Sequence, residues 1–205
     1  MPHIQPSQLA QNRFCGRHES TFSTRRYFDL KCSIAQTGGN VVPIAIRPAS
    51  TGSGEIVYGV LRARACLELG LPVNTLILDE FISDLEMVSA MFWENHSLRS
   101  LSDFETGQVF RKSLDAGLYP SDRRLAESLN TSLTEVRNCL AIARLPAEAL
   151  SAFSSVLSLR AVWSRRINEA WLRNPELFHR RALQSSTARS RVSDAKFYSD
   201  LRKGR

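Results

Sequence analysis

The chain has 205 residues, 43% of them apolar, with 27 Lys and Arg against 20 Asp and Glu. This composition is ordinary for a soluble globular protein and allows one sizeable core or two small ones. The sequence contains neither an apolar run long enough to span a membrane nor the basic and apolar segments of a secretion signal. We therefore expect a cytoplasmic protein with no membrane partner.

The positive charge is concentrated near the C-terminus. Residues 151–205 contain 12 basic and 4 acidic side chains, whereas residues 1–150 contain 15 and 16. A basic segment of this kind can contact the phosphates of nucleic acid. The alternative is a solvated or disordered end of the chain.

The four cysteines, Cys15, Cys32, Cys66 and Cys139, are far apart in the sequence. They form no Cys-x-x-Cys pair and have no clustered histidine partner, so neither a zinc site nor a disulfide framework is indicated. We expect buried thiols and no metal-binding residues.

The first hundred residues alternate between strand and helix patterns. An irregular arm and a first helix near Tyr27–Gln36 occupy residues 1–36. Residues 37–100 then form an α/β domain, with strands expected at Val41–Ile46, Ile56–Tyr58 and Val73–Leu78 and helices at Leu61–Leu69 and Leu85–His96. Gly70 and Pro72 have the spacing of a helix end. The alternation predicts an α/β N-terminal lobe.

Beyond residue 100 the strand patterns stop. Ser102 and Glu105 fit a capping box that opens a helix to about Ala116, and Ser132 and Glu135 fit another. Further helices are expected at about 121–130, 132–144, 147–153 and 160–172. We predict an all-α lobe over residues 101–180, followed by a basic, flexible tail over residues 181–205.

Residues 121–144 have the spacing of a helix-turn-helix. Leu125 and Ala126 would pack against Val136 and Leu140, and Asn130 tolerates the left-handed backbone that such a turn requires. An ordinary helical hairpin is the alternative.

The second helix of this pair would present polar side chains outward. Arg and Asn can make bidentate contacts to guanine and adenine edges. The candidate DNA-binding residues are Ser132, Thr134, Arg137 and Asn138. Because residues 121–150 carry equal numbers of basic and acidic side chains, the positive field that attracts phosphates must come from the segment after residue 151.

A glycine-led turn into an arginine-bearing helix follows the second strand. Gly59 permits close approach of a ligand, the helix start offers backbone N–H groups, and Arg62 and Arg64 add positive charge. Arg47 ends the preceding strand. This arrangement suits a phosphate, although a solvated helix end is the alternative.

An acidic residue and an amide, Glu94 and Asn95, stand near the end of another predicted helix. They could position a hydroxyl or a metal-bound water. Isolated pairs of this kind also occur on ordinary surfaces.

In this order, the segments resemble the ParB/KorB family of plasmid and chromosome partition proteins, closest to the plasmid-borne type. The resemblance runs from about Asn12 to about Leu172. Its motifs are Gly38-Gly-Asn-Val-Val-Pro-Ile-Ala-Ile-Arg-Pro48, Tyr58-Gly-Val-Leu-Arg62, Ala65-Cys-Leu-Glu-Leu-Gly-Leu-Pro-Val73, Glu94-Asn95, Leu101-Ser-Asp-Phe-Glu105, Leu125-Ala-Glu-Ser-Leu129 and Leu145-Pro146.

The resemblance implies a ParB-like α/β domain that in many members binds CTP, with Mg²⁺, and gates a DNA clamp. It also implies a helix-turn-helix that reads a centromere-like repeat in double-stranded DNA, a homodimer and a ParA-type ATPase partner. The nucleotide-binding positions that carry over are Arg47, Gly59, Arg62, Glu94 and Asn95.

Two departures affect the implied nucleotide site. Val60 and Leu61 stand where the family has a polar residue and an arginine, and Leu98 takes the place of another arginine, with Arg99 one residue late. Each lost charge-assisted hydrogen bond costs about 1.5–3 kcal/mol. We therefore expect CTP binding to be weak or absent, and no enzymatic turnover.

The sequence leaves three candidate functions to compare. The first is a sequence-specific, nucleoid- or plasmid-associated DNA-binding protein of the partition type. The second is a ParB-derived transcriptional or plasmid-competition regulator without a CTP clamp cycle. The third, a ParB-like nuclease or nucleotide hydrolase, lacks clustered carboxylates or histidines at metal-site spacing.

Overall fold

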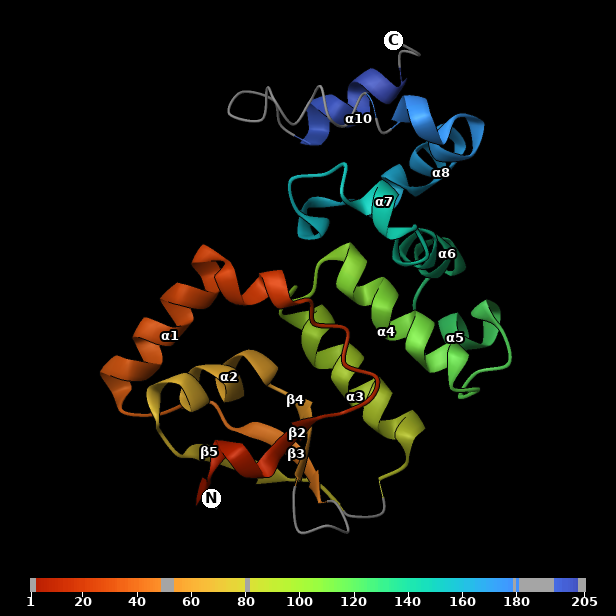
Figure 1. Cartoon of the computed structure of the whole chain (residues 1–205). Coiled ribbons are helices and arrows are strands. Elements are labelled where there is room, and N and C mark those ends of the chain that lie inside the picture. The colour runs from red at the N-terminus through yellow and green to blue at the C-terminus, as the bar shows by residue number, and fades with distance from the viewer. Residues whose placement is uncertain (1–2, 49–53, 80–81, 179, 181–193, 203–205) are drawn as a thin grey trace. The chain divides into compact units, whose positions relative to one another are not determined.

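The computed structural model describes residues 3–48, 54–79, 82–178, 180 and 194–202. The chain divides into two compact units, Met1–Ser100 and Leu101–Arg205. The first contains a sheet and helices, while the described residues of the second form helices and turns (Figure 1). The mixed α/β fold expected for the N-terminal half is confirmed. None of the described helices is both long and apolar enough to cross a membrane.

The sheet of the first unit has the strand order β1-β5-β3-β4-β2. Its strands are β1 (His3–Ile4), β2 (Leu9–Gln11), β3 (Ile44–Pro48), β4 (Gly54–Tyr58) and β5 (Val73–Ile77). Strand β3 runs antiparallel to β4 and parallel to β5. The three longer strands match the predicted ones. The short edge strands β1 and β2 contradict the expected irregular arm, because segments of two and three residues carry too little alternation to be read.

Strand β3 begins at Ile44, three residues later than predicted. The carbonyl oxygens of Val42 and Pro43 accept hydrogen bonds from Arg62 Nη1, at 3.1 and 3.0 Å. Residues 41–43 therefore lie outside the ladder, although their apolar sequence reads as strand.

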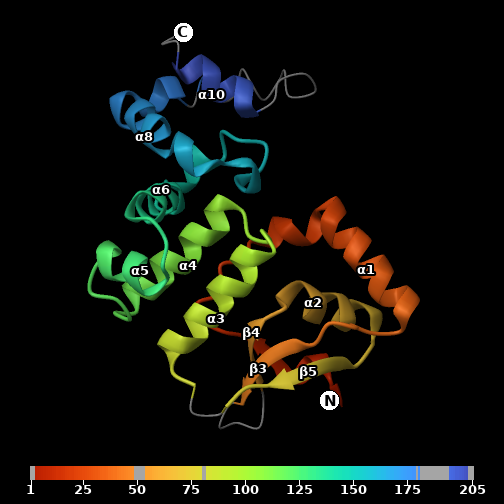
Figure 2. The same cartoon turned by 180° about the vertical axis from the view of Figure 1, so that it is seen from behind.

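Among the described residues, three α-helices accompany the sheet: α1 (Arg25–Thr37), α2 (Val60–Leu69) and α3 (Asp84–Ser97). Helix α1 packs on α2, α2 contacts β3, and α3 packs on β4 (Figures 1 and 2). The core between α1, α2 and the sheet includes Ile34, Ile44, Ile56 and Cys66. Gly70, with a φ of 66°, ends α2 in the left-handed conformation, as the sequence predicts.

The α-helices in the described part of the second unit are α4 (Asp103–Asp115), α5 (Asp122–Ser128), α6 (Leu133–Ala143), the single turn α7 (Ala147–Leu150), α8 (Ser164–Arg173) and α10 (Asp194–Arg202). Its core includes Phe104, Ile142, Phe153 and Ile167. Ser102 and Glu105 form the predicted capping box at the start of α4.

Several expectations for the second unit are wrong in detail. Ser132 caps α6, but Glu135 accepts from the Thr131 hydroxyl at 2.8 Å, so the capping bond is not reciprocal. The helix expected over 147–153 ends at Leu150. A 3-10 turn over 161–163 precedes α8, where one helix over 160–172 was expected.

The tail expected to be flexible over residues 181–205 contains the helix α10. The Asp194 carboxylate accepts a hydrogen bond from the Ser154 backbone N–H at 3.0 Å. The Tyr198 ring stacks on Trp163, with centroids 4.8 Å apart. These contacts fix α10 on its own unit. The remaining residues of the predicted tail, 181–193 and 203–205, lie outside the described part of the chain.

Three of the four cysteines are buried, as the sequence predicts. Cys15, Cys66 and Cys139 are buried, whereas Cys32 is exposed on α1. Burial raises the pKa of the Cys139 thiol to about 12.

Candidate functional site

The turn at Gly59 connects β4 to α2 and has a φ of 99°. A Cβ atom here would lie 3.1 Å from both the Ile44 side chain and Arg62 Nη2. No side chain caps α2, so backbone N–H groups of its first turn are available to an acceptor. Only glycine combines this backbone conformation with such close neighbours.

Arg62 folds back over this turn instead of pointing outward. Its Nη1 donates to the Val42 and Pro43 carbonyl oxygens, and its Nη2 donates to Glu94 Oε1 at 2.9 Å. The Arg62 side chain is 13% exposed. A protein carboxylate thus occupies the position on this guanidinium that an anionic ligand would take.

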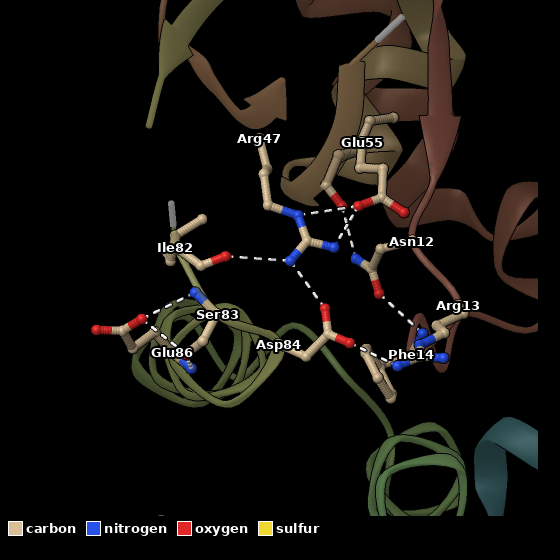
Figure 3. Close-up of polar contacts among 10 residues, drawn as sticks. Asn12, Arg13, Phe14, Arg47, Glu55, Ile82, Ser83, Asp84 and Glu86 are labelled. Carbon is tan, nitrogen blue, oxygen red and sulfur yellow. Dashed lines mark hydrogen bonds and ion pairs between the residues drawn. The ribbon is translucent and has the colours of Figure 1, made fainter. Parts of the chain in front are cut away.

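Arg47 is held in the same way by a second set of acceptors (Figure 3). It donates from Nε and Nη2 to Glu55 Oε2, and from Nη1 to Asp84 Oδ1 at 2.8 Å and to the Ile82 carbonyl oxygen at 3.2 Å. Arg13 donates to the other Asp84 oxygen. The guanidinium therefore joins two strands to the start of α3.

The protonation equilibria of this cluster follow from its hydrogen bonds. Burial alone would lower the pKa of Arg47 and raise that of Asp84. The hydrogen bonds between them, and those from Arg47 to Glu55 and from Arg13 to Asp84, outweigh burial and shift both pKa values the other way. Arg47 and Asp84 are therefore charged at neutral pH.

Asn95 stabilises the end of α3. Its Oδ1 accepts from Ser100 Oγ at 2.6 Å and from Arg17 Nη2 at 3.2 Å, and its Nδ2 donates to the Met91 carbonyl oxygen at 2.7 Å. The amide thus fixes the helix end and the arm that carries Arg17. Its partner in the predicted pair, Glu94, contacts Arg62 instead.

The helix end also explains Leu98 and Arg99. Leu98 caps the C-terminal end of α3 and is 58% exposed, whereas Arg99 adopts a left-handed conformation with a φ of 45°. Arg26 Nη1 donates to the Arg99 carbonyl oxygen. The structure thus gives Arg99 a backbone role in terminating the helix.

Gly59, Arg62 and Glu94 lie together around the start of α2. Arg47 belongs to a separate cluster with Glu55 and Asp84. Within the described ranges no group of three or more His, Cys, Asp or Glu side chains could hold a metal ion. Glu55 and Asp84 were not predicted as members of the site. Arg47 and Glu55 are directly opposed across the β3–β4 pair, and Ser83 and Glu86 form a second capping box beside Asp84, so the sequence carried a signal for each.

In the second unit, α5 and α6 are joined by a tight turn. Leu125, Ala126, Val136 and Leu140 are buried, as the sequence predicts. Asn130 lies in the turn with a φ of 47°. The buried stripe of each helix therefore faces inward, and the opposite side of α6 faces solvent.

The polar residues of α6 differ in exposure. Thr134 and Arg137 are exposed, and Ser132 is exposed at the helix start, where its hydroxyl accepts from the Glu135 N–H. Asn138 is half-buried, and its Oδ1 accepts from Ser164 Oγ at 3.4 Å. Thr134 and Arg137 are therefore the outward side chains most accessible to a partner.

Helix α4 supports α6 by unusually close packing. A Cβ atom on Gly107 would lie 2.2 Å from the Cys139 carbonyl oxygen and 2.8 Å from the Ala143 Cβ. Only glycine allows the two backbones to approach so closely. The position of α6 depends on this contact.

The two units differ in net charge. Residues 101–205 contain 18 Lys and Arg against 11 Asp and Glu, whereas residues 1–100 contain nine of each. The positive excess therefore belongs entirely to the unit that contains α6.

Residues 1–96 match the family model of the ParB N-terminal domain. This match covers almost the whole first unit. Similar proteins include the nucleoid occlusion proteins of Geobacillus sp. (strain WCH70), 28% identical over 149 residues, and Geobacillus kaustophilus (strain HTA426), 27% identical over 150 residues. Each alignment covers 73% of this chain, and the chain spans about half the length of these relatives, 51% and 52%.

Two solved structures of a C-terminally truncated ParB from Caulobacter crescentus are also similar. The one complexed to the centromeric parS site covers 99% of this chain and 100% of that chain, with 23% identity and a TM-score of 0.50. This likeness supports the fold alone. The one complexed with CTP-γ-S covers 98% and 97%, with 18% identity and a TM-score of 0.41, which is too low to compare sites.

Proposed function

We propose that this chain binds double-stranded DNA sequence-specifically, in the manner of a ParB-type partition or nucleoid occlusion protein. In this proposal α5 and α6 act as a helix-turn-helix, and α6 enters the major groove of a centromere-like site. Thr134 and Arg137 would contact base edges, while Ser132 and Asn138 lie beside them.

The observation that carries the proposal is the position of Arg137. Its side chain is 66% exposed on the solvent side of α6, opposite the buried stripe, in the unit that carries all of the excess positive charge. Arginine bonded to guanine O6 and N7 is the commonest specific base contact. The positive charge of this unit, which comes from residues 151–205, favours DNA phosphates in general.

The test is DNA selection followed by affinity measurement. Duplexes carrying random sequence, and the DNA flanking the protein's own gene, would be enriched on the purified protein. Wild type would then be compared with Arg137→Ala by gel shift. We expect about a tenfold or greater loss of affinity for the selected site, with Arg124→Ala, another exposed arginine, as the matched control. Equal, sequence-indifferent binding by wild type and Arg137→Ala would refute the proposal.

A second candidate function is DNA binding without a nucleotide cycle, as in a transcriptional or plasmid-competition regulator. It is supported by Arg47 and Arg62, which both donate to protein carboxylates. To test it, CTP with Mg²⁺ would be added to protein bound on closed circular and linear DNA carrying the selected site. Equal release rates with and without CTP favour this function. A CTP-dependent difference between circular and linear DNA favours a clamp.

A homodimer and a ParA-type ATPase partner belong to the first candidate. Two-fold symmetric DNA sites are read by two copies of a helix-turn-helix protein, with half-sites about one or more helical turns apart. Light scattering of the protein with and without the selected duplex would count the copies bound. A pull-down with the ATPase encoded nearest the gene would test the second partner.

A further inference from the structure

Arg137 has a carboxylate neighbour on the other helix of the α5–α6 pair. Its Nε lies 3.9 Å from Oδ2 of Asp122, the first residue of α5. The Asp122 side chain is 33% exposed, half the exposure of Arg137. The pair therefore spans the two helices at the surface where α6 presents its polar side chains.

Other charged side chains near the Asp122–Arg137 pair have partners of their own. Arg124 Nη1 donates to Glu127 Oε2 at 2.9 Å, one turn along α5. Glu135 accepts from the Thr131 hydroxyl. Asp122 is thus the carboxylate placed next to Arg137, whereas Glu127 and Glu135 serve their own helices.

The contact between Asp122 and Arg137 matters for the orientation of the guanidinium more than for the stability of the fold. An exposed ion pair at this distance contributes little to folding, so the contact is not explained by a need to hold the helices together. The contact uses Nε, and both Nη groups remain for other acceptors. Bidentate recognition of guanine requires a guanidinium that presents two parallel N–H groups.

A carboxylate at this position also has a long-range effect. It repels DNA phosphates, so an arginine beside it gains less from a non-specific contact with the backbone than an unaccompanied arginine would. A correct base contact can offset the repulsion because it adds directional hydrogen bonds. Asp122 would therefore lower non-specific affinity more than specific affinity.

We propose that Asp122 is a positioning residue for Arg137, orienting its guanidinium toward a guanine and raising the ratio of specific to non-specific DNA binding. The inference rests on the proposed DNA-binding function and adds to it a determinant of specificity outside the reading helix. Asp122 itself contacts no base in this scheme.

The experiment compares Asp122→Asn, Arg137→Ala and the double variant, with Glu127→Gln as a matched control that removes one negative charge from the same helix. Affinities for the selected site, for the same site with its guanines replaced one at a time, and for unrelated DNA would be measured by fluorescence anisotropy over a range of salt concentrations. Melting temperatures would be recorded for every variant.

For Asp122→Asn we expect tighter binding to unrelated DNA and about a twofold to fivefold loss of discrimination at one guanine position, the range of an exposed ion pair. The melting temperature should fall only slightly, because Asp122 lies in the first turn of α5. The substitution should cause no further loss of discrimination in the Arg137→Ala background. Glu127→Gln should tighten non-specific binding slightly and leave discrimination at each base intact.

Three results would overturn the inference alone: full discrimination in Asp122→Asn, an equal loss in Glu127→Gln, or a loss that persists in the Arg137→Ala background. A selection in which wild type enriches no sequence overturns the proposed function and this inference together. The two failures are therefore distinguishable.

Discussion

Arg47 and Asp84 form an ion pair 2.8 Å long that connects strand β3 to the first residue of helix α3. The same guanidinium bonds to Glu55 on the neighbouring strand. A position that the family resemblance assigns to a nucleotide is thus occupied by contacts within the protein. This relationship decides how substitutions at Arg47 should behave.

Arg47→Ala should destabilise the first unit in the absence of any ligand. The substitution leaves Glu55 and Asp84 without their shared partner, in a site where the Arg47 side chain is 18% exposed. Because solvent screens part of the charge, we expect a loss of about 2 kcal/mol, less than for a fully buried pair. Urea unfolding followed by circular dichroism measures it. Arg25→Ala, which breaks an exposed pair with Asp29, is the control and should cost under about 0.5 kcal/mol.

Wild-type protein should bind CTP weakly, with a Kd on the order of 1 mM or above. Glu94 holds the Arg62 guanidinium that would meet a phosphate. Glu94→Gln removes the competing charge and should tighten binding about tenfold. Isothermal titration in the presence of Mg²⁺ measures both, with Glu86→Gln at the other end of α3 as the control. A micromolar Kd for wild type would contradict the prediction.

Gly107→Ala should destabilise the second unit by about 2–3 kcal/mol, because the new methyl group overlaps the Cys139 carbonyl oxygen and forces α4 and α6 apart. Since α6 then moves, affinity for the selected DNA should fall as well. Gly39→Ala is the matched control, because an added methyl group there would meet no atom within 4 Å beyond its chain neighbours and the φ of Gly39 is not in the left-handed region. Equal melting curves for wild type and Gly107→Ala would show that the two helices can separate without cost.

Glu68 should make stability depend on pH in the acid range. Hydrogen bonds from Lys31 and then Arg64 lower the pKa of Glu68 from 4.5 to about 2. Because the folded pKa is the lower one, the contribution is present above about pH 4.5 and is lost as the pH falls toward 2. The difference in melting temperature between wild type and Glu68→Gln should therefore shrink from about pH 6 to about pH 2. A constant difference would rule out this linkage.

Much of the fold could be predicted because its signals are local. The capping box at Ser102 and the glycine at position 70 mark helix ends through the hydrogen bonds of a few neighbouring residues. Asn130 and the stripe of Val136 and Leu140 likewise specified the turn and the buried face of α6. Each of these features depends on residues close together in the sequence.

The site was harder to predict because its partners are distant in sequence. Arg62 and Glu94 are 32 positions apart, and Arg47 and Asp84 are 37 apart. The periodicity of the sequence cannot show that two such distant side chains are in contact. The sequence therefore predicted that Arg47 and Arg62 were available to bind a ligand. Asn138 was predicted to face outward for a similar reason, since its contact with Ser164 comes from another helix.

The two outermost strands of the sheet both come from the first eleven residues, and they are only two and three residues long. They cover the backbone hydrogen-bonding groups of β5 and β4 while offering little edge of their own to another chain. A shortened version lacking these residues would present two bare strand edges. Its characteristic failure would be intermolecular strand pairing and aggregation, in addition to the loss of the Ile4 and Leu9 side chains that pack against the core.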